Sequence, residues 1–391
     1  MFKKRYLEKY IAKDLKKKMV FVGGPRQVGK TTIAKTIGKA LYKNFSYLNW
    51  DNPADRKTIV TMKFDAKAKM VIFDELHKYG KWKNYIKGQF DSYGDRFNIL
   101  VTGSARLDIY RKGGDSLMGR YYFYRLHPFS LAEILGSACS LEPFKEPVFY
   151  KKSNSYVKFK KLLEFGGFPE PFLNKNAETC RRWNNQRLDR LIKEDIRDIE
   201  SVRDLSALQI LVDLLPGKVG SLLSLNGLRE DLQVAFGTIK LWMDVLERFY
   251  YHFRIYPFAF NTIKSLRKEA KLYLWDWSQV EDKGARIENI VASHLLKVCH
   301  FLHDAHGYKA ELHYLRDIEQ REVDFLITIG RKPWLAIEVK NIDQTISKNL
   351  CYFKDKLRIP FVYQLVKTSN VDFIQNKVRV MSIDTFLSGL V

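Results

Sequence analysis

The chain has 391 residues, of which 46% are hydrophobic, and its 67 Lys and Arg against 44 Asp and Glu give a formal charge of +23. This length predicts two or three domains, and the hydrophobic content excludes a disordered chain. The positive charge favours a polyanionic partner such as nucleic acid, or an anionic membrane face, although a solvated basic surface would also account for it.

A phosphate-binding pattern, G-x-x-x-x-G-K-[ST], occupies residues 24–31. The apolar run 18–22 before it predicts a buried strand, and residues 32–41 after it predict an amphipathic helix. A glycine-rich turn between a strand and a helix directs several backbone N–H groups at one anion. Lys30 would reach the β- and γ-phosphates of ATP, and the Thr31 hydroxyl would hold Mg²⁺. The predicted nucleotide-binding residues are Gly24, Pro25, Arg26, Gln27, Val28, Gly29, Lys30, Thr31 and Thr32.

Apolar runs alternate with helical patterns from about residue 15 to 135, which predicts a parallel α/β sheet. Residues 45–51 and 69–75 are the second and third predicted strands, and the third ends at Asp74 and Glu75. Ligands of open α/β sheets bind outside the carboxyl ends of the strands, so Asp74 is expected near the phosphates as part of the Mg²⁺ shell. Glu75 would polarise the attacking water.

The fourth predicted strand, residues 97–102, ends at Thr102. A hydroxyl there could contact the γ-phosphate or the water, while turn chemistry at a strand end is the other interpretation. Arg120 precedes a fifth predicted strand over residues 121–126. It could stabilise transition-state charge in its own or a neighbouring subunit, or it could form a surface salt bridge.

Five motifs follow one another in this part of the chain: GPRQVGKTT (24–32), FDELH (73–77), LVTGSA (100–105), LMGR (117–120) and LHPFSLAE (126–133). The ordered set resembles a prokaryotic AAA-type ATPase family whose members carry a largely uncharacterised C-terminal domain. The resemblance covers nearly the whole chain. It implies a P-loop ATPase core that uses ATP and Mg²⁺, and it leaves the biological role open.

The middle of the chain begins with a segment, 136–160, that has no clear periodicity and contains Pro143 and Pro147. We expect a linker or lid there. Residues 181–203 are dense in charge of both signs, with apolar residues at helical spacing. They predict a long amphipathic helix that bridges two domains.

A winged-helix-like region is expected next. Helices are predicted over 205–215, 225–232 and 237–248, and a hairpin between 250–255 and 271–275. The third helix could enter a DNA groove, but its basic residues are only Lys240 and Arg248, so packing between domains is favoured. The basic loop 262–268 could track phosphates as a wing tip or be a solvated loop.

The C-terminal part predicts a leading helix over 284–296 and a series of strands. The strands are expected over 311–316, 322–329, 334–340, 360–365 and 379–383. Side chains alternate along a strand, so Glu338 and Lys340 share one face. Burying these charges is costly unless they serve each other or a metal. Asp324 lies on the preceding strand of a predicted hairpin, where it would meet Glu338 and hold a divalent cation with it.

Such an ion would activate a water for attack on a phosphodiester, with Lys340 balancing the charge and Glu288 completing the site. The order Glu288, Asp324, Glu338-x-Lys340 resembles the PD-(D/E)XK nuclease superfamily, although Val323 replaces the proline of its name. A salt-bridged exposed face is the other interpretation.

Histidines and cysteines suggest no metal site. His300 and His303 share a helix face, but helical spacing carries His306 away from it, so zinc is not favoured. The cysteines, which are Cys139, Cys180, Cys299 and Cys351, form no C-x-x-C pair. No apolar run reaches the length of a membrane span, and no apolar signal core follows the basic start. We therefore expect a cytoplasmic protein with no membrane segment.

The predicted fold class is α/β: a P-loop NTPase parallel sheet, a helical and winged-helix region, and a C-terminal α/β nuclease-like domain. The expected boundaries are 1–135 for the ATPase domain, 136–203 for linker and bridging helices, 204–278 for the winged helix and 279–391 for the nuclease-like domain. The first functional hypothesis is a Mg²⁺-dependent ATPase that acts on DNA, either as a single chain or as a homo-oligomer. In this hypothesis the C-terminal domain binds or cleaves nucleic acid. The alternative is a nucleotide-dependent switch or scaffold whose C-terminal domain docks a protein partner.

Overall fold

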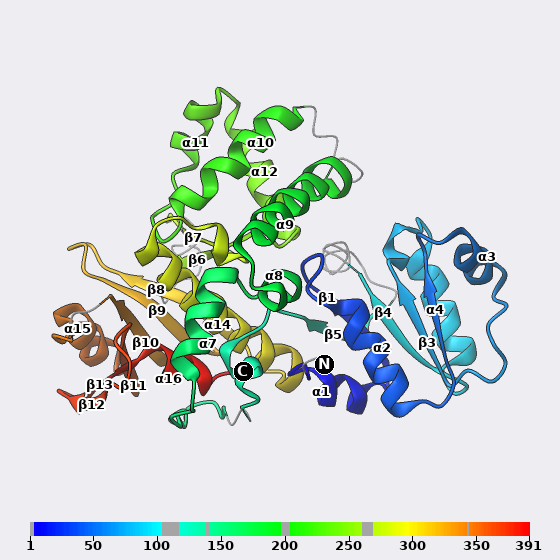
Figure 1. Ribbon diagram of the computed structural model, residues 1–391, viewed down its shortest axis with the longest axis horizontal. Coiled ribbons are helices and arrows are strands. Elements are labelled where there is room, and N and C mark those ends of the chain that lie inside the picture. Colours follow the sequence, from blue (N-terminus) through cyan, green and yellow to red (C-terminus); the bar gives the residue numbers. More distant parts are fainter. Residues whose placement is uncertain (1–3, 104–116, 138–140, 197–203, 260–268, 342–343) are drawn as a thin grey trace. The chain divides into compact units, whose positions relative to one another are not determined.

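A computed structural model describes residues 4–103, 117–137, 141–196, 204–259, 269–341 and 344–391 (Figure 1). Its internal contacts divide the chain into two compact units. The first comprises residues 1–127 with 248–250, and the second comprises residues 128–247 with 251–391.

The first unit is built on a five-stranded sheet in the order β2-β3-β4-β1-β5, in which every neighbouring pair is parallel. Its strands are β1 (Met19–Gly23), β2 (Phe45–Asn49), β3 (Met70–Asp74), β4 (Asn98–Thr102) and β5 (Tyr121–Arg125). Its helices are α1 (Glu8–Asp14), α2 (Lys30–Leu41), α3 (Pro53–Thr61), the short 3₁₀ helix η1 (Leu76–Lys78) and α4 (Trp82–Tyr93).

Alternation along the strands divides the apolar side chains of this sheet between its two faces. Phe21 of β1 and Phe73 of β3 are buried in one cluster with Ile59 of α3 and Trp82 of α4. Every residue of β1 and β3 is buried, as expected for central strands of a parallel sheet that is covered on both faces. The carboxyl ends of β1, β3 and β4 therefore open together at one edge of a rigid platform.

The second unit starts with helices. They are α6 (Leu131–Leu135), α7 (Ser155–Phe165), α8 (Pro169–Asn174), α9 (Ala177–Arg190), the π-helix η3 (Leu191–Ile196), α10 (Leu205–Leu214), the 3₁₀ helix η4 (Leu215–Lys218), α11 (Leu225–Leu232) and α12 (Phe236–Arg248). Helix α7 begins inside the segment 136–160 that the sequence left without periodicity. On α12, Asp244 and Glu247 both pair with Arg254, which ties the carboxylates of this helix to the following strand.

The second sheet has eight strands in the order β12-β13-β11-β10-β9-β8-β6-β7 and mixes parallel and antiparallel pairs. Its strands are β6 (His252–Pro257), β7 (Lys271–Leu274), β8 (Ala310–Arg316), β9 (Glu322–Ile329), β10 (Lys332–Lys340), β11 (Phe361–Val366), β12 (Asp372–Gln375) and β13 (Val378–Ser382). The remaining helices are the 3₁₀ helix η5 (Trp277–Gln279), α14 (Lys283–His306), α15 (Lys348–Leu357) and α16 (Ile383–Ser388).

The predicted hairpin of the winged-helix region is present as the antiparallel pair β6 and β7. It is not a free wing, because β6 also pairs with β8 through Tyr256 and His313. The hairpin thus extends the C-terminal sheet. The α/β architecture expected from the sequence is confirmed at this level: a parallel N-terminal sheet, a helical region and a C-terminal mixed sheet.

A clamp joins α6 to α14 within the second unit. Ser130 and Glu133 form a capping box at the start of α6. The Lys297 ammonium donates to the Ser130 hydroxyl at 2.9 Å and pairs with Glu133. One turn earlier on α14, His294 accepts the Leu131 N–H at its Nε2, at 3.0 Å. The last of the five sequence motifs, 126–133, therefore ends in buried polar contacts with the long helix.

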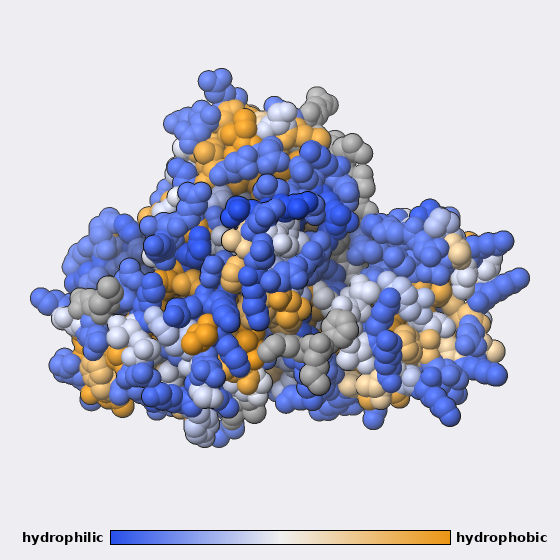
Figure 2. All heavy atoms as spheres, viewed as in Figure 1, coloured by the Kyte–Doolittle hydropathy of each residue, from blue (hydrophilic) through white to orange (hydrophobic). Residues whose placement is uncertain are grey.

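Hydrophilic residues cover most of the face seen in Figure 2, with apolar patches between them. Exposed apolar side chains on the helical region include Ile210, Phe236 and Leu241. Within the described ranges, no helix combines the length and the apolarity that a membrane crossing requires.

Candidate functional site

The phosphate loop has the backbone that its glycines allow. It joins β1 to α2, and Gly29 at the start of α2 has a φ of 100°. Gly24 has a φ of 145°, and a Cβ added there would lie 2.5 Å from the carbonyl oxygen of Leu126. Both positions therefore exclude side chains, which keeps the loop backbone open to an anion at the positive end of α2.

Lys30, the first residue of α2, reaches back over this loop. Its side chain is buried, and its ammonium donates to the carbonyls of Gly24 at 3.0 Å and Pro25 at 2.8 Å. These bonds hold the positive charge above the turn whose backbone N–H groups would surround a phosphate.

A buried carboxylate lies at the centre of the predicted Mg²⁺ site. Thr31 Oγ1 donates to Asp74 Oδ2 at 2.7 Å, and Thr102 Oγ1 donates to Asp74 Oδ1 at 2.6 Å. Asp74 and Thr102 are direct neighbours in the register of β3 and β4. Tyr47 of β2 donates a third bond to Asp74 at 2.7 Å. A hydroxyl and a carboxylate that both face the loop are the oxygen ligands that Mg²⁺ prefers, so these residues fit the ion.

Glu75 follows Asp74 in a left-handed conformation, with a φ of 54°. The strand ends at this turn, and Glu75 Oε2 lies 3.4 Å from His77 Nε2. Burial raises the pKa of Glu75, the Lys30 charge opposes this shift, and the Asp74 charge adds to it. A carboxylate with a raised pKa beside a phosphate loop is suited to accept a proton from water.

Arg120 lies at the amino ends of the strands, opposite the carboxyl ends where the phosphate loop and Asp74 lie. Its carbonyl accepts the N–H of Met19, the first residue of β1, about 13 Å along the strand from the phosphate loop. Its guanidinium pairs with Asp91 of α4 at 2.8 Å. The predicted role of Arg120 in its own subunit is therefore wrong, because the side chain is at the amino end of the strands.

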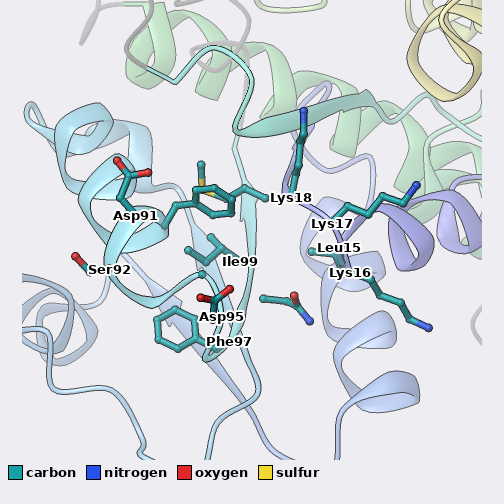
Figure 3. Close-up of a pocket in the computed structure, with 13 residues that line it drawn as sticks. Leu15, Lys16, Lys17, Lys18, Asp91, Ser92, Asp95, Phe97 and Ile99 are labelled. Carbon is teal, nitrogen blue, oxygen red and sulfur yellow. The ribbon is translucent and has the colours of Figure 1, made fainter.

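The same edge contains a pocket of about 380 Å³ (Figure 3). Lys16, Lys17 and Lys18 line one side of it, and Asp91 and Asp95 line the other. It lies at the amino ends of β1 and β4, so it is separate from the predicted nucleotide site.

The C-terminal acids that the sequence singled out are gathered at the β9–β10 hairpin. Ile337 pairs with Phe325 in the antiparallel ladder, so Glu338 and Asp324 lie one position beyond it on each strand. Asp324 Oδ2 accepts the N–H of Val339 at 2.8 Å. Lys340 Nζ pairs with Glu338 Oε1 at 2.9 Å, while the buried Glu338 Oε2 has no hydrogen-bond partner among the described residues.

A lysine that the sequence analysis did not consider lies among these acids. Lys271 Nζ is 2.7 Å from Glu322, 3.5 Å from Glu288 and 3.7 Å from Asp324. Its side chain is only 4% exposed. Two residues along β7, Tyr273 donates to Glu288 Oε1 at 2.6 Å. The sequence did indicate that Lys271 and Tyr273 share one face of a short strand, because side chains alternate along a strand. It did not indicate which charged side chains they would face.

The electrostatics of this carboxylate cluster, defined as Glu288, Glu322, Asp324 and Glu338, follow from burial. Burial and the charge of Asp324 raise the pKa values of Glu288 and Glu338, and burial raises that of Asp324. Burial would lower the pKa of Lys271, but the carboxylates of Glu288 and Asp324 outweigh it, so that pKa is raised. Lys271 is therefore a permanent cation inside the cluster.

Other predicted features have different outcomes. Over the described residues, no three His, Cys, Asp or Glu side chains are grouped so that they could hold a metal ion, which includes the histidines of α14. Ser104 and Ala105 of the third motif, Cys139 and the whole basic loop 262–268 lie outside the described residues. Tyr47 was missed because a tyrosine inside a strand gives no local sign of contact with Asp74.

Comparison with protein families gives one match to each part of the chain. Residues 16–135 match the family described as AAA domain. Residues 156–280 and 283–386 match two families described as domains of unknown function, DUF8612 and DUF4143. The AAA domain carries the phosphate loop, Asp74 and Arg120, and an AAA domain implies nucleotide binding.

Curated relatives match most of this chain at low identity. The uncharacterized protein MJ1544 of Methanocaldococcus jannaschii is 23% identical over 344 residues, covering 82% of this chain and 75% of the relative. The uncharacterized protein Rv2008c of Mycobacterium tuberculosis is 20% identical over 339 residues, covering 82% of this chain and 70% of the relative.

Among solved structures, the RuvB Holliday junction branch migration motor of Thermotoga maritima is 14% identical and covers 63% of this chain and 87% of its own. Its TM-score is 0.30. A Bacteroides Pif1 bound to ssDNA is 12% identical, covers 42% of this chain and 57% of its own, and has a TM-score of 0.23. Scores this low do not establish a common overall fold.

Proposed function

We propose that this protein is a Mg²⁺-dependent ATPase that acts on DNA. The observation that carries the proposal is the convergence on Asp74, where Thr31 from the phosphate loop and Thr102 from the neighbouring strand both donate hydrogen bonds. Nothing in the packing of the sheet requires a buried acid there, and a buried carboxylate is retained at a cost in stability.

The proposed nucleotide site is made by the backbone N–H groups of the loop 24–29, to which Pro25 contributes none, and by Lys30, Thr31 and Thr32. Thr31 and Asp74 would hold Mg²⁺, which neutralises phosphate charge when it is bound. Lys30 would exchange its two carbonyl partners for phosphate oxygens, since those carbonyls belong to the loop itself. This exchange needs no movement of α2.

The remaining roles concern the attacking water and the transition state. Glu75 would orient and deprotonate the water, helped by its raised pKa. Thr102 would sense the γ-phosphate through the carboxylate to which it already donates. Arg120 would act on a nucleotide only if that nucleotide is held by a neighbouring copy; in its own chain it forms the surface salt bridge with Asp91 that was the other interpretation.

The experiment that tests the ATPase is steady-state hydrolysis by the full chain and by Lys30→Ala. We expect the wild type to turn over ATP in the presence of Mg²⁺ and the variant to lose turnover while its thermal unfolding stays cooperative. Equal rates in the two proteins would contradict the proposal.

Action on DNA is supported by the formal charge of +23. Binding through phosphate contacts weakens steeply with salt because condensed counterions are released. We expect duplex DNA to bind at low salt and to lose about 10³-fold in affinity between 50 and 200 mM salt. No affinity for DNA at low salt would favour the second candidate, a nucleotide-dependent switch that docks a protein partner.

For the second unit we propose a winged-helix-like region over 204–278 and a PD-(D/E)XK-like domain over 279–391. The order α14, β8, β9, β10, with Glu288, Asp324, Glu338 and Lys340 on three of these elements, supports the second assignment. The pairing of Arg254 with two acids of α12 supports a packing role for that helix. Lys271 in the carboxylate cluster favours binding of nucleic acid or a protein partner over metal-dependent cleavage.

The two roles of the C-terminal domain are separated by incubating the protein with DNA and Mn²⁺. We expect binding without cleavage. Cleavage by the wild type that is lost in Glu338→Ala would instead establish a nuclease.

A further inference from the structure

The carboxylate cluster of the second unit contains its own cation. The nuclease-like assignment implies a divalent ion held by Asp324 and Glu338. Three carboxylates of the cluster, those of Glu288, Glu322 and Asp324, face the ammonium of Lys271 at 2.7 to 3.7 Å.

The charges of the cluster are already largely balanced. Lys271 faces three acids, Arg316 pairs with Glu322 at 2.6 Å, and Lys340 pairs with Glu338 at 2.9 Å. Four carboxylates therefore face three cations. A divalent cation is instead held by carboxylates that are not already paired with another cation. An entering ion would have to displace an ammonium that is almost fully buried.

The position of Lys271 is fixed by the fold. It lies on β7, which pairs with β6, and its backbone also forms a bridge with Leu222. The ammonium also lies 5.8 Å from the ring centroid of Tyr314. With Tyr273 bound to Glu288 from the same strand face, β7 contributes two side chains to the cluster.

We propose that the Lys271 ammonium takes the place of a divalent metal in this cluster, so that the C-terminal domain does not bind Mg²⁺ or Mn²⁺ there. The cluster then serves to join β7, α14 and β9 through a network of ion pairs. This inference refines the C-terminal part of the proposed function and is independent of whether the AAA domain hydrolyses ATP.

The test is Mn²⁺ binding to the full chain without nucleotide, measured from the electron paramagnetic resonance signal of free Mn²⁺. Wild type and Glu338→Gln are expected to bind the same number of ions, because the comparison cancels any ion at the phosphate loop. One additional ion per chain in the wild type would overturn the proposal.

Lys271→Met gives the complementary result. Removal of the ammonium is expected to create one Mn²⁺ site per chain, which is lost again in Lys271→Met/Glu338→Gln. Lys340→Met is the matched control, since it removes a lysine beside Glu338 and leaves Lys271 in place, and it should gain no site. A folded Lys271→Met that gains no ion, or an equal gain in Lys340→Met, would overturn the proposal. If circular dichroism shows that Lys271→Met is unfolded, the wild-type comparison decides alone.

Discussion

Two buried lysines, Lys30 and Lys271, lie near acids but differ in the groups that their ammonium ions contact. In the phosphate loop, Lys30 donates to backbone carbonyls, and the nearby acid Asp74 is satisfied by the hydroxyls of Thr31, Thr102 and Tyr47. In the carboxylate cluster, Lys271 pairs directly with the acids. The carbonyl and hydroxyl partners in the first arrangement carry no full charge, whereas the partners of Lys271 in the second are themselves ionised.

The difference shows that a set of residue types does not define a site. Both regions contain acids at strand ends and a lysine nearby. Weak partners such as carbonyls and hydroxyls can be exchanged for phosphate or metal, whereas an ion pair in a buried environment is costly to break.

Loss of Lys30 tests the first half of the comparison and has the largest expected effect. Lys30→Ala should lower ATP turnover by about 10² to 10³, the usual consequence of removing a preorganised charge stabiliser. Steady-state hydrolysis measures it. Lys39→Ala is the matched control, because Lys39 is an exposed lysine in the last turn of the same helix. A similar loss in both variants would contradict a specific role of Lys30.

Loss of the proposed base is next. Glu75→Gln should lower turnover by about 10²-fold while nucleotide binding is retained. Since burial raises the pKa of Glu75, the carboxylate becomes protonated at a higher pH than an ordinary glutamate. Wild-type turnover should therefore fall as the pH is lowered through that raised value, and the residual rate of Glu75→Gln should lack this step. A pH–rate profile that is the same in both proteins would exclude Glu75 as the base.

The third prediction concerns stability and sharpens the contrast between the lysines. Lys271→Met should lower the free energy of unfolding by about 3 kcal/mol, because it leaves carboxylates buried without their cation. Lys340→Met should cost less than Lys271→Met, because the Lys340 ammonium is partly exposed to water, although its partner Glu338 is buried. Urea unfolding of the second unit measures both. Equal effects would mean that Lys271 is not the central cation of the cluster.

The smallest expected effect is the loss of stability that results from lowering the pH. His294 donates from Nδ1 to the Ile290 carbonyl and accepts at Nε2, so it is buried as the neutral ring, and burial lowers its pKa to about 3. The unfolded chain takes up a proton below an ordinary pKa of about 6.5, so the stability is present above that pH and is lost as the pH falls. We expect His294 to account for about 1 kcal/mol of destabilisation between pH 7 and 5.5. The pH dependence of unfolding should be weaker in His294→Gln; an unchanged dependence would contradict this.

Much of the first region was predictable, because its residues are ordered by short-range rules. A buried strand, the glycine pattern and an amphipathic helix place Lys30 and Thr31 within a few residues of each other. The acid at the end of the third strand then follows from the geometry of parallel sheets. The direct approach of Thr31 and Thr102 to Asp74 agrees with that expectation.

The second region was predictable only in part. The strands and the facing positions of Asp324 and Glu338 follow from alternation in a hairpin. Lys271 lies more than fifty residues before Asp324 and reaches it through β6, which pairs with β8. No local pattern encodes such a contact. Arg120 is a different case, because it precedes the fifth strand of a predicted parallel sheet, so its position at the amino ends of the strands could have been inferred from the sequence.

The clamp between α6 and α14 determines at which residue a C-terminal fragment of this chain should begin. A fragment that begins at residue 136, the boundary expected from the sequence, would remove Ser130, Leu131 and Glu133 and so strip Lys297 and His294 of contacts made deep in the interior. One that begins at residue 128 keeps them, which makes it the better choice for producing the C-terminal half by itself.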